Sequence, residues 1–168
     1  MQPWEEAHSP LLVELSSDPQ VVRHIALGEP WQAAFAREVS ERQRQHWTKH
    51  GFGWRAVIEK ATQEAIGFSA LNFLGDGAAG LDADEYEIGW WLRPSAWGRG
   101  FAVESGSAML EEAFGRIGAP SVVARIQPMN DASIRVACAI GMRRDRSTTG
   151  SYGERVEIFR LMRGPFEA

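Results

Sequence analysis

The stretch Tyr86-Glu-Ile-Gly-Trp-Trp-Leu-Arg-Pro-Ser-Ala-Trp-Gly-Arg-Gly-Phe-Ala-Val-Glu104 decides how this chain is expected to fold. It begins with an apolar run that is typical of a strand and ends in an amphipathic segment, residues 101–117, that is typical of a helix. Between them lie Gly98 and Gly100, which permit turns and close approaches that other residues do not. Because the amides at a helix N-terminus lack partners and carry the positive end of the helix dipole, the stretch predicts a backbone cradle for phosphate.

Two nucleotide-binding motifs are excluded by the same residues. A dinucleotide fingerprint would need glycine at Val103, and a P-loop would need a Gly-Lys-Ser/Thr ending that is absent. The simpler alternative is that the two glycines only shape a tight turn from strand to helix. A cradle made of amides fits an acidic protein, because it needs no surplus of lysine and arginine.

The segments on either side predict one α+β domain over residues 1–168. Ahead of the stretch we expect two short helices starting at Ser9-Pro10 and Asp18-Pro19, a surface helix over 31–50, and a hairpin of strands over 53–58 and 66–73. After it we expect a strand over 122–126, a helix over 130–140 and a closing strand near 155–162. Residues 75–84 show no periodicity and are expected to form an exposed, mobile loop. The order predicts a mixed, mostly antiparallel sheet with one parallel crossover.

Composition narrows the class of protein further. The chain has 168 residues, 44% hydrophobic and 24% charged, with a net charge of -4, which argues against binding to a nucleic-acid backbone. No segment is apolar enough to predict a membrane span, and the single cysteine, Cys138, excludes a disulfide framework and fits the reducing cytoplasm. Cys138 lies mid-helix without a basic neighbour, so we do not expect it to be a nucleophile. The four histidines are scattered, and we expect no metal site.

Two motifs give the chain a family resemblance. Residues 86–104 and the later N-D-A-S-I-R-V-A-C-A-I-G-M, residues 130–142, resemble the GCN5-related N-acetyltransferase (GNAT) family. They are most similar to the branch that contains ribosomal-protein-alanine N-acetyltransferases, the RimJ/RimL-like branch, as is L-S-S-D-P-Q-V-V-R-H-I near the N-terminus. The resemblance implies the GNAT fold, a central mixed sheet with helices on both faces, acetyl-CoA as cosubstrate, and acetyl transfer to a primary amine.

The sequence departs from the family pattern in two places. Ser95 stands where the family usually has Gln or Arg, three residues before the first glycine, so one side-chain contact to phosphate is lost. The chain also begins almost where the first strand of the family should end. We therefore expect that strand to be short or missing, and an unpaired sheet edge makes a homodimer plausible.

The resemblance assigns coenzyme binding to the cradle, to the strand before it and to the helix at residues 130–140. The assigned residues are Trp90, Trp91, Leu92, Trp97, Gly98, Arg99, Gly100, Phe101, Ala102, Asn130 and Ser133. The amides of residues 97–102 would hold the pyrophosphate, and an amide near residues 90–92 would polarise the thioester carbonyl. Gly89 is expected to supply a bulge that opens the strand, with packing space for the neighbouring tryptophans as the alternative. Asn130 would hold the pantetheine arm, unless it only caps the helix.

Catalysis needs a base for the amine and a proton for the leaving thiolate. Glu87 is the predicted base because it lies on the strand that enters the cradle, and Glu85 is second; the alternative is a solvated carboxylate. Many family members carry a tyrosine acid at the position that is Ala137 here. Ser133, or a water that it holds, is the predicted replacement.

The acceptor is expected near the early helices. Trp31, Phe35 and Glu85 are the predicted acceptor-binding residues, although core packing is the usual role of large aromatic side chains. A protein or peptide N-terminus is the favoured acceptor by resemblance alone. Two alternatives stay open: a small amine such as an antibiotic, polyamine or amino acid, and a non-catalytic domain that senses coenzyme A.

Overall fold

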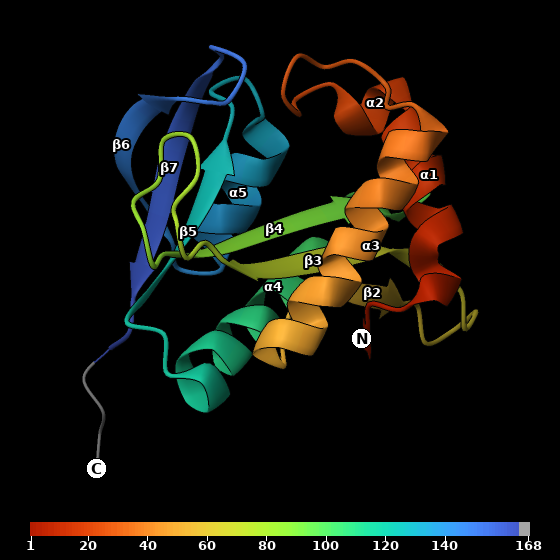
Figure 1. Cartoon of the computed structure of the whole chain (residues 1–168), viewed down its shortest axis with the longest axis horizontal. Coiled ribbons are helices and arrows are strands. Elements are labelled where there is room, and N and C mark those ends of the chain that lie inside the picture. The colour runs from red at the N-terminus through yellow and green to blue at the C-terminus, as the bar shows by residue number, and fades with distance from the viewer. Residues whose placement is uncertain (165–168) are drawn as a thin grey trace.

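The computed structural model describes residues 1–164 and contains a seven-stranded mixed sheet covered by helices (Figure 1). The strands lie in the order β1-β2-β3-β4-β5-β7-β6. Their bounds are β1 Gln2–Pro3, β2 Arg55–Ile58, β3 Ala65–Phe73, β4 Tyr86–Leu92, β5 Ser121–Ile126, β6 Arg143–Thr149 and β7 Arg155–Met162. All neighbours pair antiparallel except β4 and β5, which are parallel. The α+β class, the single parallel crossover and the short first strand are thereby confirmed.

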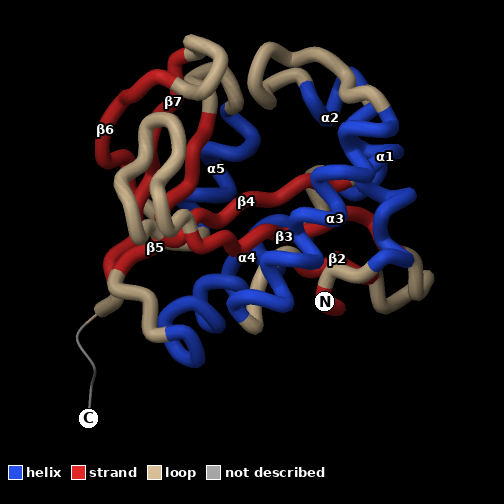
Figure 2. Tube along the Cα trace, in the orientation of Figure 1, coloured by secondary structure: helices blue, strands red, loops and turns tan. Residues whose placement is uncertain are grey.

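The helices cover both faces of this sheet (Figure 2). Their bounds are α1 Ser9–Ser17, α2 Pro19–Val22, α3 Ala33–His50, α4 Phe101–Glu111 and α5 Asp131–Ala139, with short turns η1 Glu6–His8 and η2 Pro94–Ala96 and a π-helical end, η3 Glu112–Ile117. On one face α1 and α3 pack against Phe68 and Ala70 of β3. On the other, α4 and α5 pack against Leu71 and Ile88. Successive side chains of a strand point to opposite faces, which is why neighbours in β3 belong to different cores.

Local signals place the ends of the early helices. The carboxylate of Asp18 accepts a hydrogen bond from the amide of Gln20 at 2.8 Å, and Pro19 is the first residue of α2. Gly51 has φ 72° and ends α3, as expected from its position. Helices α1 and α2 begin, and α3 ends, where the sequence predicted, whereas α3 begins at Ala33, two residues later than expected.

Strand β6 was not predicted. Its residues, Arg-Arg-Asp-Arg-Ser-Thr-Thr, lie at the edge of the sheet and are mostly exposed, so they lack the apolar alternation that indicates a strand. Pairing with β7 and a hydrogen bond from Arg144 to the buried carboxylate of Glu157, at 2.7 Å, stabilise the strand. Charged edge residues also discourage pairing with other chains.

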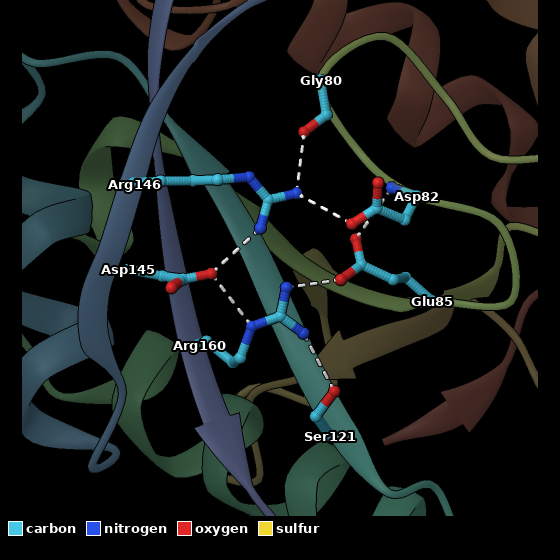
Figure 3. Close-up of polar contacts among 7 residues, drawn as sticks. All are labelled: Gly80, Asp82, Glu85, Ser121, Asp145, Arg146 and Arg160. Carbon is cyan, nitrogen blue, oxygen red and sulfur yellow. Dashed lines mark hydrogen bonds and ion pairs between the residues drawn. The ribbon is translucent and has the colours of Figure 1, made fainter.

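The expectation of an exposed loop at residues 75–84 is wrong at Leu81. This side chain is 8% exposed and packs with Val123 and Ile158 of the sheet. Ion pairs add to the attachment, as Figure 3 shows: Arg146 contacts Asp82 at 3.2 Å and the carbonyl of Gly80 at 3.4 Å. One buried leucine and several arginine contacts are thus enough to hold a segment that has no periodic pattern.

The sheet opens between β4 and β5. These strands share a single registered pair, Glu87 with Val123, whereas β3 and β4 pair without a shift from Gly67–Leu92 to Phe73–Tyr86. No bulge therefore occurs at Gly89, and that expectation is wrong. The opening arises because β5 diverges from β4.

Candidate coenzyme cradle and acceptor cavity

The cradle follows β4 directly. Gly98 and Gly100 have φ values of 71° and 85°, in the left-handed region that favours glycine, and a Cβ at either position would meet no atom within 4 Å. Gly100 is the N-cap of α4. Within residues 1–164, the amides of residues 98–102 have no backbone or side-chain acceptor. Five consecutive amides at an open helix N-terminus form a site for an anion.

The side chains of the cradle contribute less than its backbone. The amide of Trp97 donates to the carbonyl of Pro94 at 3.1 Å, so the free amides begin one residue later than expected. The Trp97 indole donates to the carbonyl of Leu92 at 2.9 Å. Arg99 forms an ion pair with Glu59 and lies over the Phe101 ring at 4.8 Å, so in this structure its charge is already partnered.

The side of β4 that faces β5 presents further backbone amides. The amide of Arg93 bonds to Ile66, and that of Leu74 bonds to the carbonyl of Glu85, which sets the alternation along the β3–β4 pair. In an antiparallel pair, the residues between two bonded pairs turn their amides to the other side. The amides of Trp90 and Leu92 therefore face the opening beyond Glu87, where the thioester donor was expected.

A cavity of about 70 Å³ lies at this opening and brings Asn130 and Ser133 of α5 next to β4. The side-chain oxygen of Asn130 accepts from the amide of Ser133 at 3.1 Å, so Asn130 does cap the helix. The Trp90 indole donates to the Ser133 hydroxyl oxygen at 3.3 Å. Because a hydroxyl is one donor and two acceptors, this bond leaves its hydrogen available.

A larger cavity of about 320 Å³ lies on the face of the sheet covered by α1 and α3. Its floor comes from β3 and β4, and its rim comes from residues 24–26 after α2 and from the β6–β7 loop, residues 150–154. Figure 1 shows these two loops facing each other across the sheet. Trp31 lines the cavity as expected, whereas Phe35 lies behind it, 40% exposed and 5.1 Å from the Trp31 ring.

Glu87 enters this cavity as half of an ion pair. Its carboxylate accepts two hydrogen bonds from Arg125, at 2.6 and 3.0 Å, and its side chain is 15% exposed. Burial acts to lower the pKa of Arg125, but the bonds and charge of Glu87, with the charge of Glu154, more than offset this, so the pKa is raised. The alternative of a solvated strand carboxylate does not hold for Glu87.

Glu85 lies elsewhere. Its carboxylate pairs with Arg160 and accepts from the amide of Asp82 at 3.3 Å, in the cluster that attaches the 75–84 loop (Figure 3). It lines neither cavity. The two carboxylates that looked equivalent along the sequence therefore have different surroundings.

Three residues that line the site were not among the predicted site residues. His24 borders both cavities, and burial lowers its pKa, with a further decrease from Arg23 and an opposing effect from Asp131. A pKa lowered below 6.5 favours the neutral imidazole at pH 7. Arg125 and Asn72 are the other two. An arginine inside the apolar run 122–126 was the available signal, because a charge in a buried strand needs a partner.

The described part of the chain offers no metal centre: within residues 1–164 no three His, Cys, Asp or Glu side chains converge. His46, one helical turn before His50, uses both ring nitrogens, against the carbonyl of Phe52 and the amide of Phe73, each at 3.0 Å. Among the same residues, every helix is too short or too polar to cross a bilayer.

Comparisons with known proteins agree with this geometry. Residues 1–143 match the family described as "Acetyltransferase (GNAT) domain". The uncharacterized N-acetyltransferase YnaD of Bacillus subtilis is 42% identical over 60 residues, which is 36% of this chain and 35% of that protein. The FsC-acetyl coenzyme A-N(2)-transacetylase of Aspergillus fumigatus is 26% identical over 157 residues, 83% of this chain and 60% of that protein. The chain thus spans between one third and two thirds of these two relatives.

Solved structures show the same fold. An acetyltransferase from Agrobacterium tumefaciens has a TM-score of 0.79 at 26% identity, over 95% of this chain and 88% of that one. The ribosomal alpha-N-protein acetyltransferase RimL in complex with coenzyme A gives 0.75 at 16% identity, over 96% and 92%. Spermidine N-acetyltransferase from Vibrio cholerae, with CoA and spermine, gives 0.72 at 16% identity, over 96% and 94%. The chain therefore belongs to the GNAT family, a family of acyltransferases.

Proposed function

We propose that this protein transfers the acetyl group of acetyl-CoA directly to a primary amine, with a protein or peptide N-terminus as the favoured acceptor. One observation carries the proposal: the coenzyme opening and the acceptor cavity meet across β4. Gly89, Trp91 and Arg125 line both cavities. An acetyl group held on one side of the strand is therefore within reach of an amine held on the other, and no covalent enzyme intermediate is needed.

The backbone binds the coenzyme in this proposal. The amides of residues 98–102 hold the pyrophosphate, and the amide nitrogen of Asn130, whose oxygen caps α5, donates to the pantetheine arm. The amide of Trp90 or Leu92 donates to the thioester oxygen, where negative charge develops during attack. Acetyl-CoA supplies the activated acyl group.

Side chains move the protons. Glu87 accepts a proton from the substrate ammonium, directly or through water, so that the free amine forms a bond to the acyl carbon as the carbon–sulfur bond breaks. Ser133 donates its hydroxyl hydrogen toward the departing sulfur, since the Trp90 indole already occupies its oxygen at 3.3 Å. His24 is a second candidate base because it borders both cavities and its pKa is lowered.

Other functions differ in what they require. A small amine as acceptor needs only the cavity, and spermidine acetyltransferases share the fold. A non-catalytic sensor of coenzyme A would fit Ala137, which replaces the tyrosine that many family members use. The RimJ/RimL-like branch, a cytoplasmic location and a homodimer are further proposals that rest on sequence likeness, on the single cysteine and on an unpaired strand edge.

One experiment separates these functions. The protein is mixed with acetyl-CoA and a panel of amines, and release of free thiol is followed together with the melting temperature. We expect acetyl-CoA to raise the melting temperature, because a ligand of the folded state stabilises it by mass action, and at least one amine to be acetylated. Binding without turnover on any amine would establish the sensor, and no thermal shift at all would refute the cradle.

A further inference from the structure

We infer that the acceptor is an α-amino group next to a carbonyl, on an amino-acid residue with a large apolar side chain. This inference rests on the proposed function and deepens it by naming the class of acceptor. Three properties of the larger cavity carry it: its aromatic walls, its charge and its free hydrogen-bond donors.

The walls form a recess for an apolar group. Trp54 stacks on Phe68 with ring centroids 4.1 Å apart, and Trp31 meets Trp91 edge-on at 5.2 Å. The floor between these rings is made of the smallest side chains. Ala70 and Gly89 lie directly opposite each other in the β3–β4 register, and a Cβ at Gly89 would meet only the Cβ of Ala70, at 3.8 Å. Aromatic walls above a floor that carries only a methyl group suit a leucine-, methionine- or phenylalanine-like group.

The charge of the cavity matches one ammonium group. Among the residues that line it, in the described part of the chain, the carboxylates are Glu87 and Glu154 and the permanent cation is Arg125. Arg125 neutralises one carboxylate, which leaves one net negative charge. Polyamines and aminoglycosides carry several ammonium groups, each of which needs a compensating anion when water is excluded. A volume of about 320 Å³ is also near the lower limit of ~300 Å³ for ligand sites.

Hydrogen-bond donors beside Glu87 favour a carbonyl next to the amine. Asn72 is the direct neighbour of Glu87 in the β3–β4 register, and its oxygen accepts from the Trp54 indole at 3.1 Å, which leaves its NH2 group available. Arg125 uses one hydrogen on each of its three nitrogens, toward Glu87 and the carbonyl of Ala79, and two remain. An α-carbonyl satisfies these donors. A simple alkylamine leaves them without an acceptor, which is costly in a dehydrated site.

The test compares four acceptors with the full-length protein and acetyl-CoA: phenylalaninamide, alaninamide, 2-phenylethylamine and spermidine. We expect kcat/KM for phenylalaninamide to exceed each of the others by about tenfold or more. Alaninamide lacks the large side chain, 2-phenylethylamine lacks the carbonyl, and spermidine carries several positive charges instead of one. Equal values, or a preference for alaninamide or spermidine, would overturn the inference while leaving acetyl transfer intact. No turnover on any of them or on the wider amine panel, with acetyl-CoA still bound, would instead refute the proposed function.

A variant locates the specificity in the recess. Gly89→Val adds a Cβ whose nearest neighbour is the Cβ of Ala70 at 3.8 Å, so the strand is expected to fold and the two further methyl groups to fill the recess. The ratio of kcat/KM for phenylalaninamide over alaninamide should fall about tenfold or more. Gly115→Val, at another glycine with open space around it but outside both cavities, should leave that ratio unchanged. An unchanged ratio in Gly89→Val would contradict the placement of the side chain.

Discussion

The cradle and the acceptor cavity are built in opposite ways. The cradle comes from one continuous segment, residues 98–102, and uses backbone amides at a helix N-terminus. The acceptor cavity collects side chains from β3, β4, β5, β7 and α3, from Trp54 just before β2, and from two distant loops. A ligand common to a whole family can be bound by backbone that tolerates sequence change, whereas the identity of the acceptor depends on individual side chains that the fold brings together.

The largest expected effect falls on the cradle. Gly100→Val should abolish the thermal shift caused by acetyl-CoA and all turnover, because a branched side chain at φ 85° distorts the loop and covers its amides. Gly51→Val is the matched control: Gly51 has φ 72° and equally open surroundings, but it ends α3 away from the cradle. Both variants should lose stability, and only Gly100→Val should lose coenzyme binding. Equal coenzyme affinity in the two would remove the cradle from its proposed role.

The next effect separates chemistry from coenzyme binding. Glu87→Gln should lower kcat by about 10²-fold or more, as for loss of a general base, and leave the Kd of acetyl-CoA within about threefold. Glu85→Gln lines neither cavity and keeps a side-chain oxygen that can accept a hydrogen bond from Arg160, so it should change kcat by less than about threefold. A normal kcat in Glu87→Gln, with activity lost instead in His24→Gln, would transfer the role of base to His24.

These two regions also differ in how far the sequence predicted them. The cradle was predictable because its signals, Gly98 and Gly100 before an amphipathic segment, are adjacent in the chain. The ion pair of Glu87 with Arg125 was not predictable. The two residues are 38 positions apart, and only the parallel crossover brings β5 beside β4. Residue types indicate what chemistry is available, but pairing across strands depends on a register that no local pattern specifies.

The same reasoning explains the structural errors. The sequence of β6 is charged and exposed, so its strand conformation comes from pairing with β7 and not from its own pattern. Gly89 suggested a bulge, although the small residue instead leaves the floor of the acceptor cavity open. A glycine in a strand indicates that a larger side chain is disfavoured there. Whether the reason is a turn, a bulge or space for a ligand depends on the surrounding fold.

A smaller effect concerns the support of Arg125. The carbonyl of Ala79 in the 75–84 loop accepts from Arg125 at 3.2 Å, and Arg146 attaches this loop through Asp82 and Gly80 (Figure 3). Arg146→Gln should raise the KM of the acceptor about two- to threefold and leave that of acetyl-CoA unchanged, because exposed ion pairs contribute little. Arg37→Gln, at an exposed arginine of α3 that lines neither cavity, serves as the control. An equal rise for both substrates would mean that the loop supports the fold and not the acceptor cavity.

The smallest effect is on stability as a function of pH. Burial lowers the pKa of His46 below its ordinary value of 6.5, and the neighbouring His50 lowers it further. Well above pH 6.5 the ring is neutral in both states, and as the pH falls through 6.5 the unfolded chain takes up the proton first, so the free energy of unfolding decreases. His46→Gln should reduce the slope of this free energy between about pH 6.5 and 5, where paired carboxylates do not yet titrate. Urea denaturation at several pH values measures it, and an unchanged slope would contradict the assignment.

The single β4–β5 pair has one more consequence. Glu87 shares its backbone register with Val123 and its side chain with Arg125, both of β5, so it lies at the vertex of the angle that the two strands form. The carboxylate that is proposed to take up the proton is therefore held by both strands at the point where the sheet begins to open.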